Sequence, residues 1–413
     1  MRAIFLLNLG LALFSIPIAS SRHTISTDRE GGDAEDHAAT SEGCIVSRMS
    51  RWDMARTGKE ISFSTNPLDN FEAPRVELLN STTGEQWEFD GISEDGRQAV
   101  MIGFYRDPSF AFLGTGNLRF YLEFSFPNGS RYSIVDYAEE SIIDICTGRG
   151  TRGTWTGAGR TYTFEVSDSM SNAKVTMNSP EVSGTITLES IAPPRYADNS
   201  IWPSPNASTM PIPYFHWVEP IPAANSKLDI ILNGKPVSWS GIGGHERLWG
   251  AFNWYTCVHA MTAIRFRAGS YAVSLVEFNS NIYKNLTVSS VILVQGGDVV
   301  FKTRRVQSSE TEDYMELFKI YSSKGVTTSA LSDKVTGLEL ILRSPGRDLT
   351  WKFSLRHLNI GFEHRFSQGM GSTGYSGVAN GGLVGTGQNY GPAFSEVMMF
   401  PKKSLLFTQN YIG

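Results

Sequence analysis

The chain has 413 residues, of which 41% are hydrophobic, 12% aromatic and 19% charged, so its length predicts two to three domains that need no metal or disulfide framework to fold. Its 36 basic and 41 acidic residues give a formal net charge of −5 without long runs of like charge, which argues against a nucleic-acid-binding protein. The 40 glycines, scattered among aromatic and β-branched residues, favour short strands joined by tight turns.

Residues 1–20 have the pattern of a secretory signal peptide. Arg2 precedes an apolar stretch from Ala3 to Phe14, and small residues follow, which is the usual order of regions in such peptides. A membrane anchor is the alternative, but the apolar stretch is short and is followed by Pro17. We therefore expect the protein to enter the secretory pathway, either secreted or in an endomembrane or vesicle compartment, with no integral membrane domain after signal removal.

Residues 21–41 are rich in Asp, Glu, Gly and Ser and predict a disordered leader. In a secretory protein, Asn-x-Ser/Thr sequons are candidate glycosylation sites, and this chain has them at Asn80, Asn128, Asn206 and Asn285. Three cysteines allow one disulfide. We favour Cys44–Cys146, because Cys257 lies in an aromatic segment typical of a core. No Cys/His cluster has the spacing of a metal site, so we expect no metal.

Alternation of apolar and polar side chains predicts antiparallel β-strands along most of the remaining chain. The clearest case is residues 118–126, after which Pro127–Ser130 turns the chain into a second alternating segment. Similar segments recur at residues 100–104, 162–166, 182–188, 264–275 and 349–355. The best helix candidate, Glu310 to Tyr321, also fits a strand. The pattern predicts an all-β protein built from sandwiches or barrels.

Two interruptions divide this pattern, one from Pro193 to Pro213 and a Gly- and Trp-rich one from Ser238 to Gly250. We place the domain boundary near residues 250–260, with an N-terminal domain over residues 42–255 and a C-terminal domain over residues 256–413. Since no repeat of fixed period is present, propellers and solenoids are disfavoured.

Two segments resemble common catalytic motifs, but the residues or elements that each motif requires around it are missing. Gly148–Gly153 matches the glycine pattern of a dinucleotide-binding loop, but a β segment follows where a helix is required. His245-Glu246 begins a zinc-protease pattern, yet Trp249 stands where the second His should be. Any catalysis by this protein is therefore not obviously hydrolytic, redox or metal-dependent.

The densest unusual stretch runs from Trp239 to Tyr255 and places His245, Glu246 and Arg247 among glycines and tryptophans. One interpretation is structural, with Glu246 and Arg247 paired to hold a loop against a core. We assign Gly243, His245, Glu246 and Arg247 to one structural motif.

Residues 241–250, Gly-Ile-Gly-Gly-His-Glu-Arg-Leu-Trp-Gly, resemble the signature of the carotenoid 1,2-hydratase-like superfamily. The resemblance is closer to the fungal Diels-Alderases that work beside hybrid polyketide–peptide assembly lines. Residues 86–90, residues 213–217 and the Gly-rich segment leading to Glu396 and Phe400 also fit, so the resemblance covers essentially the whole chain after the leader. The chain departs from related sequences at Gly244-His245-Glu246, where they carry Tyr-His-Asp.

The resemblance implies an N-terminal β-sandwich and a C-terminal lipocalin-like β-barrel with the substrate pocket between them. It also implies an intramolecular Diels–Alder (4+2) cycloaddition, free of cofactors, of a linear polyene polyketide–amino-acid intermediate of tetramic acid or pyrrolinone type. A polyketide synthase–peptide synthetase would be the functional partner. The product would be a decalin or a cytochalasin-type macrocycle, and the variant signature and secretory features slightly favour the latter. Such a reaction needs a shaped apolar cavity and one or two hydrogen-bond donors.

For the donor we nominate Arg365, because its spacing from Trp351 matches that of a basic residue which donates to the substrate carbonyl in the resembled family. An exposed arginine, or a partner of Glu363, is the alternative, and His364 is the fallback donor. Each of the further substrate-binding candidates could instead be structural, and they are Glu85, Asn117, Tyr214, Trp217, Trp249 and Trp351.

Two other functions remain open. A secreted lipocalin-like carrier could bind a hydrophobic metabolite without transforming it. A polyene hydratase or isomerase, as in the wider superfamily, could use His245 and Glu246 as acid–base groups.

Overall fold

The computed structural model describes residues 43–53, 63–77, 79, 83–108, 114–250 and 254–401. The predicted signal peptide (1–20), the leader (21–41) and the sequon at Asn80 lie outside the described residues. The other three sequon asparagines, Asn128, Asn206 and Asn285, are exposed.

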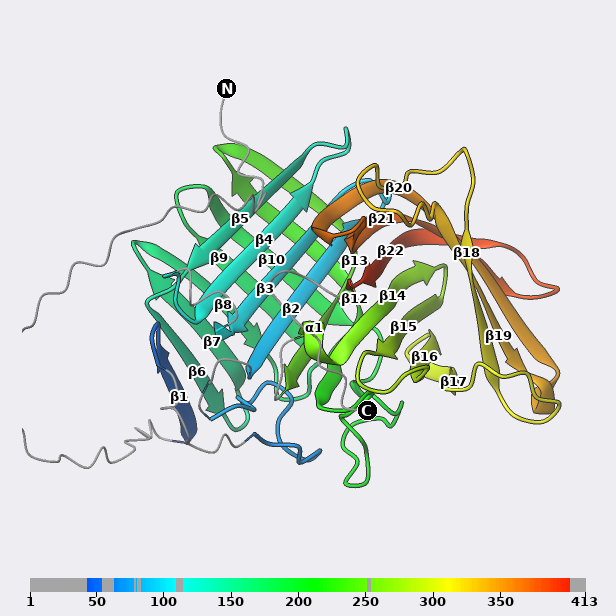
Figure 1. The fold of residues 1–413 in the computed structure, drawn as a ribbon, viewed down its shortest axis with the longest axis horizontal. Coiled ribbons are helices and arrows are strands. Elements are labelled where there is room, and N and C mark those ends of the chain that lie inside the picture. Colours follow the sequence, from blue (N-terminus) through cyan, green and yellow to red (C-terminus); the bar gives the residue numbers. More distant parts are fainter. Residues whose placement is uncertain are drawn as a thin grey trace, which may run out of the picture. The chain divides into compact units, whose positions relative to one another are not determined.

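The first half of the described chain forms one continuous antiparallel sheet of 13 strands. Its strands are β1 (Cys44–Ser50), β2 (Gly84–Ser93), β3 (Ala99–Arg106), β4 (Leu118–Ser125), β5 (Arg131–Tyr137), β6 (Glu140–Cys146), β7 (Gly150–Gly157), β8 (Arg160–Val166), β9 (Asn172–Asn178), β10 (Val182–Ser190), β11 (Arg195–Tyr196), β12 (Phe215–Leu232) and β13 (Lys235–Gly250). Their order is β1-β6-β7-β8-β9-β10-β12-β13-β2-β3-β4-β5, and β11 pairs with β12. Figure 1 shows β2 to β5 side by side.

The second half forms a sheet of nine strands in the order β17-β16-β15-β14-β22-β21-β20-β19-β18, a nearly closed barrel. Its elements are α1 (Trp254–Cys257), β14 (Val258–Ala268), β15 (Tyr271–Ser280), β16 (Thr287–Gln295), β17 (Asp298–Thr303), β18 (Tyr314–Ile320), β19 (Gly337–Ser344), the short 3-10 helix η2 (Pro345–Arg347), β20 (Leu349–Ser367), β21 (Met370–Leu383) and β22 (Asn389–Met399). The ambiguous segment Glu310–Tyr321 is therefore a strand, and the change of sheet lies between β13 and β14. These elements confirm the predicted all-β class.

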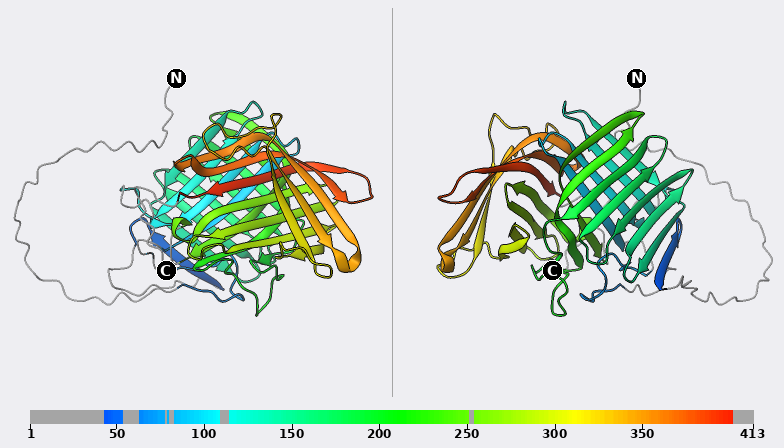
Figure 2. Two further views of the ribbon diagram at one scale, coloured as in Figure 1. Left: turned by 45° about the vertical axis from the view of Figure 1, so that its right-hand side comes forward. Right: turned by 180° about the vertical axis from the view of Figure 1, so that it is seen from behind.

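The two layers expected of a sandwich are two halves of one curled sheet. Because β13 pairs with β2, the strands on either side of that pair form a half-barrel (Figure 2). Trp87 on β2 packs edge-on against Trp155 on β7, with ring centroids 5.5 Å apart, and Phe120 on β4 stacks on Tyr162 of β8 at 3.6 Å. The aromatic core thus lies inside the curl, where such side chains bury the most apolar area.

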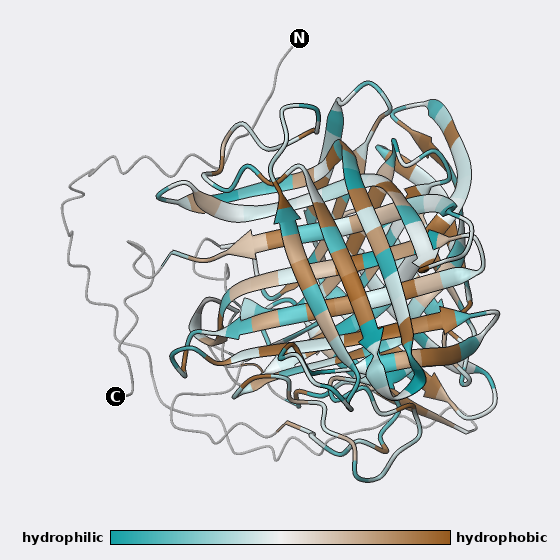
Figure 3. Cartoon of the chain, turned by 90° about the vertical axis from the view of Figure 1, so that its right-hand side faces the viewer, coloured by the Kyte–Doolittle hydropathy of each residue, from teal (hydrophilic) through white to brown (hydrophobic). Residues whose placement is uncertain are grey.

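Local sequence explains the strands and their turns. Along β4 the buried Leu118, Phe120 and Leu122 alternate with less buried residues, as a strand with one face on a core requires. Figure 3 shows hydrophobic and hydrophilic bands alternating along many strands. Asn233-Gly234 joins β12 to β13 with φ values of 49° and 75°, which a tight two-residue hairpin turn demands.

The barrel formed by the second sheet is filled by its own side chains. Phe266, Phe301, Trp351, Phe353 and Tyr375 belong to one buried cluster inside it. Trp351 meets Phe301 edge-on at 5.7 Å between ring centroids. The barrel interior is therefore a packed core in this protein.

Buried ion pairs connect the two sheets. Arg265 on β14 contacts Asp90 on β2 and lies 3.1 Å from Glu219 on β12, and Glu219 in turn holds Arg195 at 2.6 Å. Gly244 makes room for this contact, because a Cβ atom there would lie 2.3 Å from the Arg265 guanidinium. Since buried charges need partners, this network ties β14 of the second sheet to β2 and β12 of the first.

The disulfide Cys44–Cys146 ties β1 to β6, with Cα atoms 4.2 Å apart, and Cys257 is a buried free thiol. Among the described residues, no helix is long and apolar enough to cross a membrane. No group of three or more His, Cys, Asp or Glu side chains in that part of the chain is arranged to hold a metal ion.

Candidate active site

A cavity of about 200 Å³ lies between the two sheets. Strands β2, β3, β4, β12 and β13 line it from the first sheet, and β14, β20, β21 and β22 line it from the second. Aromatic side chains form much of its wall, namely Phe215, Trp249, Trp254, Phe362, Phe366 and Phe400. An aromatic cavity between two structural units is typical of a small-molecule site.

A row of polar side chains crosses the first sheet beneath this cavity. Strand register places Glu246 on β13 opposite Glu88 on β2, which lies opposite Gly103 on β3, which lies opposite Tyr121 on β4. Gly103 lacks a side chain where the ring of Tyr105 lies, and a Cβ atom there would be 2.3 Å from that ring. The Tyr105 hydroxyl can therefore donate to Oε1 of Glu88 at 2.8 Å.

The cavity acids Glu88, Glu246 and Glu396 have raised pKa values, so each keeps its proton to a higher pH than an ordinary carboxyl group does. Burial raises the pKa of Glu88, and it raises the pKa of Glu246 well above its usual value, where the charge of Glu88 adds to the effect. Burial also raises the pKa of Glu396 to about 7, against the hydrogen bond from Ser372. A protonated carboxyl group donates a hydrogen bond, so these acids can act as donors to a bound ligand.

One cation borders the cavity beside these acids. Arg119 on β4 pairs with Asp107 at 3.5 Å, and its guanidinium lies 4.3 Å from the ring centroid of Tyr105. Its charge lowers the pKa of Glu88 and so opposes part of the effect of burial.

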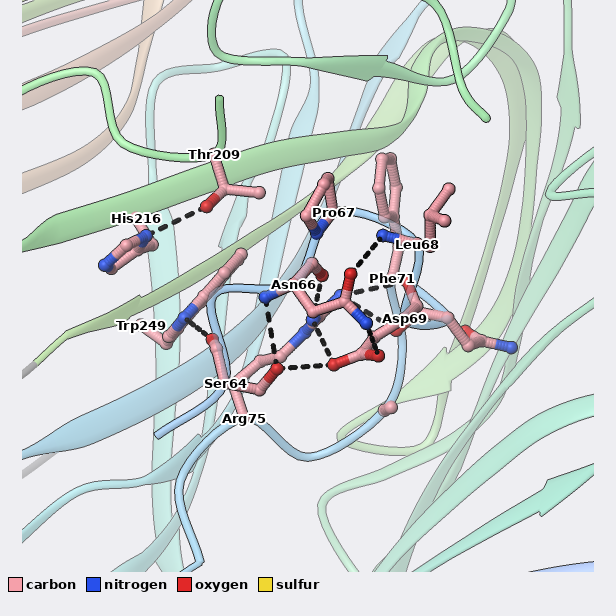
Figure 4. A network of polar contacts seen from close by, with 12 residues as sticks. Ser64, Asn66, Pro67, Leu68, Asp69, Phe71, Arg75, Thr209, His216 and Trp249 are labelled. Atoms are coloured by element: carbon pink, nitrogen blue, oxygen red, sulfur yellow. Dashed lines mark hydrogen bonds and ion pairs between the residues drawn. The ribbon is translucent and has the colours of Figure 1, made fainter. Parts of the chain in front are cut away.

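The wall residue Trp249 is held rigidly from behind. Its indole nitrogen donates to the Ser64 carbonyl at 3.0 Å, the Arg75 guanidinium lies 5.0 Å from its ring centroid, and His216 stacks on it at 5.2 Å (Figure 4). Nδ1 of His216 lies 2.9 Å from the Thr209 hydroxyl, and burial lowers the pKa of His216 to about 4. The ring of Trp249 is therefore fixed in the core of the curled sheet, on the face of β13 opposite Glu246, and supports the edge of the cavity.

The signature segment is part of strand β13. The prediction that Ser238–Gly250 interrupts the strand pattern is therefore wrong. Alternation sends Glu246 toward the cavity and its neighbours His245 and Arg247 to the opposite face. The expected pairing of Glu246 with Arg247 is therefore wrong. Arg247 instead lies 3.3 Å from Glu85 and 3.7 Å from the ring centroid of Trp87.

The other two signature positions also have structural roles. His245 stacks on Phe89 at 3.9 Å, and its Nε2 lies 3.0 Å from Oε2 of Glu72. Gly243 allows close packing of β13 on β2, because a Cβ atom there would lie 2.3 Å from the Asp90 carbonyl oxygen.

Arg365, the nominated donor, does not line the cavity. Its side chain is 61% exposed and lies 3.4 Å from Glu363. Alternation along β20 explains the error, because Phe362, His364 and Phe366 line the cavity and the odd-numbered Arg365 lies between two of them. Arg365 is therefore the exposed arginine beside Glu363 that the alternative interpretation described. The fallback donor, His364, lines the cavity.

Four further candidates do not line the cavity. Trp351 lies in the barrel core, and Asn117 is buried, with its amide donating to the Asp53 carbonyl at 2.7 Å. Tyr214 is 46% exposed. Trp217 lies one layer behind the cavity, where its indole nitrogen donates to Oε2 of Glu246 at 2.8 Å. Local aromatic patterns could not separate wall residues from core residues.

Of the predicted site residues, Glu85, Trp249 and His364 line the cavity together with Glu246. Glu85 is buried and lies 3.3 Å from Arg247, so its carboxylate belongs largely to the fold. Four further cavity residues were not predicted from the sequence, namely Glu88, Glu396, Tyr105 and Tyr121, although residues 86–90 and Glu396 lie in segments that carry the resemblance.

The curled sheet, the nearly closed barrel and the acid-lined aromatic cavity define a β protein that binds small molecules. The Diels-Alderase-like family model matches residues 41–401. The chain is 46% identical over 385 residues to Diels-Alderase cheD of Chaetomium globosum, covering 93% of this chain and 89% of that relative. It is also 46% identical over 358 residues to Diels-Alderase phmD of Phaeosphaeria nodorum, covering 87% of this chain and 99% of the relative.

The fold is similar to that of CghA in a crystal structure with Sch210972, with a TM-score of 0.75 at 22% identity, covering 87% of this chain and 100% of that chain. The chain belongs to the Diels-Alderase-like family, and the protein is an enzyme. The resemblance predicted from residues 241–250 is thereby confirmed.

Proposed function

We propose that this protein catalyses the intramolecular Diels–Alder cycloaddition of a linear polyene polyketide–amino-acid intermediate, of tetramic acid or pyrrolinone type, without a cofactor. The observation that carries the proposal is the cavity between the sheets, where aromatic side chains and carboxyl groups with raised pKa values line the same space. The family supports the reaction type, since its relatives cheD and phmD are named Diels-Alderases.

The aromatic wall accounts for the shaping of the substrate. A linear polyene has many rotatable bonds, and only a few conformers bring its diene and dienophile into contact. Packing against aromatic rings that line the cavity, such as Phe215 on β12 and Phe362 on β20, restricts the chain to such conformers, which removes part of the entropic barrier. A concerted cycloaddition needs no nucleophile, so the remaining task of the protein is electronic.

The acids of the cavity account for activation of the dienophile. A protonated carboxyl group of Glu246 or Glu396 can donate a hydrogen bond to the carbonyl conjugated with the dienophile, which draws electron density from it. Such a donor is worth more in a water-poor cavity than in solvent. This assignment replaces Arg365, whose side chain is turned to solvent.

We further propose that a polyketide synthase–peptide synthetase supplies the substrate and that the protein acts in the secretory pathway. Both proposals rest on the sequence, the first on the family resemblance and the second on the signal-peptide pattern of residues 1–20. A cytochalasin-type macrocycle is the favoured product, and a decalin is the alternative.

The test is to incubate the purified protein with a linear polyene precursor and to measure the rate and the stereochemical ratio of cyclised products against buffer. We expect a faster reaction and a single dominant stereoisomer. The variant Leu248→Trp, which fills the cavity, should abolish both effects, whereas Val135→Trp at an exposed position should not.

The same experiment separates the other functions. Recovery of unchanged ligand bound to the protein, with no cyclised product, identifies a carrier. A product heavier than its substrate by one water identifies a hydratase, because cycloaddition leaves the mass unchanged.

A further inference from the structure

The acids Glu88 and Glu246 form a directly opposed cross-strand pair. They are register partners in the antiparallel pair β2–β13, and both side chains line the cavity. Directly opposed residues have Cβ atoms about 5 Å apart, and two like charges at that position destabilise a sheet. Both side chains are half-buried, so this repulsion is larger than in open solvent and the pair retains a proton.

The hydrogen bonds around the pair leave part of each carboxyl group available to the cavity. Oε1 of Glu88 accepts from the Tyr105 hydroxyl at 2.8 Å, and Oε2 of Glu246 accepts from the Trp217 indole at 2.8 Å. Both donors are uncharged, so they orient the carboxyl groups without neutralising them. The neighbours His245 and Arg247 make their polar contacts on the other face of β13, with Glu72 and Glu85.

Two carboxyl groups that share one proton supply an acid and a base at the same place. The pair titrates as a unit, with one carboxyl ionised while the other is protonated. Burial raises the pKa of both carboxyl groups, the charge of Glu88 adds to the effect at Glu246, and the charge of Arg119 opposes part of it at Glu88; the net result extends this state toward neutral pH. A Diels–Alder cycloaddition transfers no proton, so the proposed function leaves this capacity unused.

We propose that the Glu88–Glu246 pair gives this enzyme a second activity, the reversible enolisation of the carbonyl compound bound in the cavity. This proposal rests on the proposed function in one respect, that a carbonyl compound of this class occupies the cavity. The ligand is a neutral lactam or ketone with a C–H bond acidified by its carbonyl, either on the adjacent carbon or through a conjugated double bond.

The step balances within the pair and the ligand. The ionised carboxylate removes the proton from carbon, and the C–H electron pair forms a new carbon–carbon double bond. The carbonyl π electrons, relayed through any conjugated double bond, move to oxygen, which takes the proton of the other carboxyl group. The pair still holds one proton afterwards, and reversal returns a proton to the same carbon or to another carbon of the conjugated system.

The test measures hydrogen–deuterium exchange on a ligand that cannot cyclise. The probe is a 3-acyl-1,5-dihydropyrrol-2-one with a saturated acyl chain, incubated with the full chain in D2O, and NMR follows loss of the ring C5–H signal. Its concentration is chosen to saturate the change in tryptophan fluorescence, since Trp249 and Trp254 line the cavity. We expect exchange at least about tenfold faster than in buffer, the lower end of the gain from general acid–base catalysis.

Matched variants assign the activity to the pair. Glu88→Gln and Glu246→Gln keep the shape and an acceptor oxygen for Tyr105 or Trp217 but remove the shared proton, so each should reduce exchange to the buffer rate. Glu165→Gln, at an exposed position on β8, should exchange like the wild type. Thermal unfolding of each variant checks that it is folded. One folded Gln variant is sufficient for the comparison with the wild type.

The outcomes separate the two proposals. A wild type that cyclises the polyene but exchanges the probe no faster than buffer overturns enolisation alone. A wild type that exchanges the probe but cyclises no polyene overturns the proposed function alone. Folded Gln variants that exchange as fast as the wild type, or a probe that leaves tryptophan fluorescence unchanged, also overturn the inference.

Discussion

The hydroxyl of Tyr121 on β4 lies 2.9 Å from Nε2 of His364 on β20, and the same hydroxyl donates to Oε1 of Glu123 at 2.8 Å. Burial lowers the pKa of His364 to about 4, so the ring is neutral at pH 7. A hydroxyl has one proton to donate, so while Tyr121 donates to Glu123 its oxygen can accept only from a His364 ring protonated at Nε2. This chain of donors joins the two sheets at the wall of the cavity.

Removing the Tyr121 hydroxyl should weaken this connection. Tyr121→Phe leaves His364 and Glu123 without their shared partner, and we expect the free energy of unfolding to fall by about 1–3 kcal/mol. Urea unfolding measures the change. Tyr132→Phe on the neighbouring β5 removes only an exposed hydrogen bond to Asn233 at 3.3 Å. Its free energy of unfolding should therefore fall by less than half as much as that of Tyr121→Phe. Equal losses in the two variants would show that the contact between the sheets contributes nothing.

The acid Glu396 should make stability decrease as pH rises. Its pKa is raised from 4.5 to about 7 in the folded state, so between these values the folded protein binds more protons than the unfolded chain. Stability therefore falls with rising pH through this window and the loss is complete above pH 7. Glu396→Gln removes this term, so the variant should gain stability relative to the wild type between pH 5 and pH 8.

Buried histidines act in the opposite direction, which is why the variant is compared with the wild type at each pH. The pKa of His364 and that of His357 are lowered to about 4, so these residues favour the folded state more as pH rises from 4 to 6.5. Their contribution is the same in both proteins and cancels. A difference in Tm between the two proteins that stays constant from pH 5 to pH 8 would contradict the prediction.

The assignment of the hydrogen-bond donor predicts opposite results for two variants. Glu246→Ala removes a donor inside the cavity and should lower kcat for cycloaddition by about a hundredfold, the usual effect of losing one preorganised donor. Arg365→Ala truncates a side chain that is 61% exposed and should change kcat by less than about twofold. Initial rates at saturating substrate measure both. The reverse ranking would restore Arg365 as the donor.

The glycine at position 244 should not tolerate a side chain. Gly244→Ala places a Cβ atom 2.3 Å from the Arg265 guanidinium and displaces it from Asp90 and Glu219. Breaking a buried ion pair costs about 3 kcal/mol or more, and we expect a loss of unfolding free energy of that size. Gly387→Ala is the control, because nothing lies within 4 Å of its Cβ position. A tolerant Gly244→Ala variant would mean that Arg265 has another place to go.

The alternation of apolar and polar side chains along the sequence predicts much of the fold. The strand and turn at residues 118–130 follow from side-chain spacing and from a Gly that accepts positive φ, and β4 and β5 lie as expected. The same rule could have excluded Arg365, because Phe362, His364 and Phe366 share one face of β20 and Arg365 lies on the other. The prediction of Arg365 instead relied on its spacing from Trp351 and did not use the alternation of side chains along β20.

Aromatic side chains were harder to assign from the sequence. Trp249 lines the cavity, whereas Trp351 fills the barrel and Trp217 supports Glu246 from behind. All three occupy similar alternating segments, and their burial is alike. Whether a buried ring faces a cavity or a core depends on what the opposite sheet places against it, which the local sequence does not contain.

The sequence by itself determined the all-β class, the family and the buried face of clearly alternating strands such as β4, because these depend on residue type and on a period of two. Only the tertiary structure decided that Glu88 lies opposite Glu246, since that register follows from pairing β2 with a strand far along the chain. The 12% aromatic content that first indicated a core is also divided by that pairing into core and cavity wall. Long-range register is set by the sum of many contacts, and no single segment encodes it.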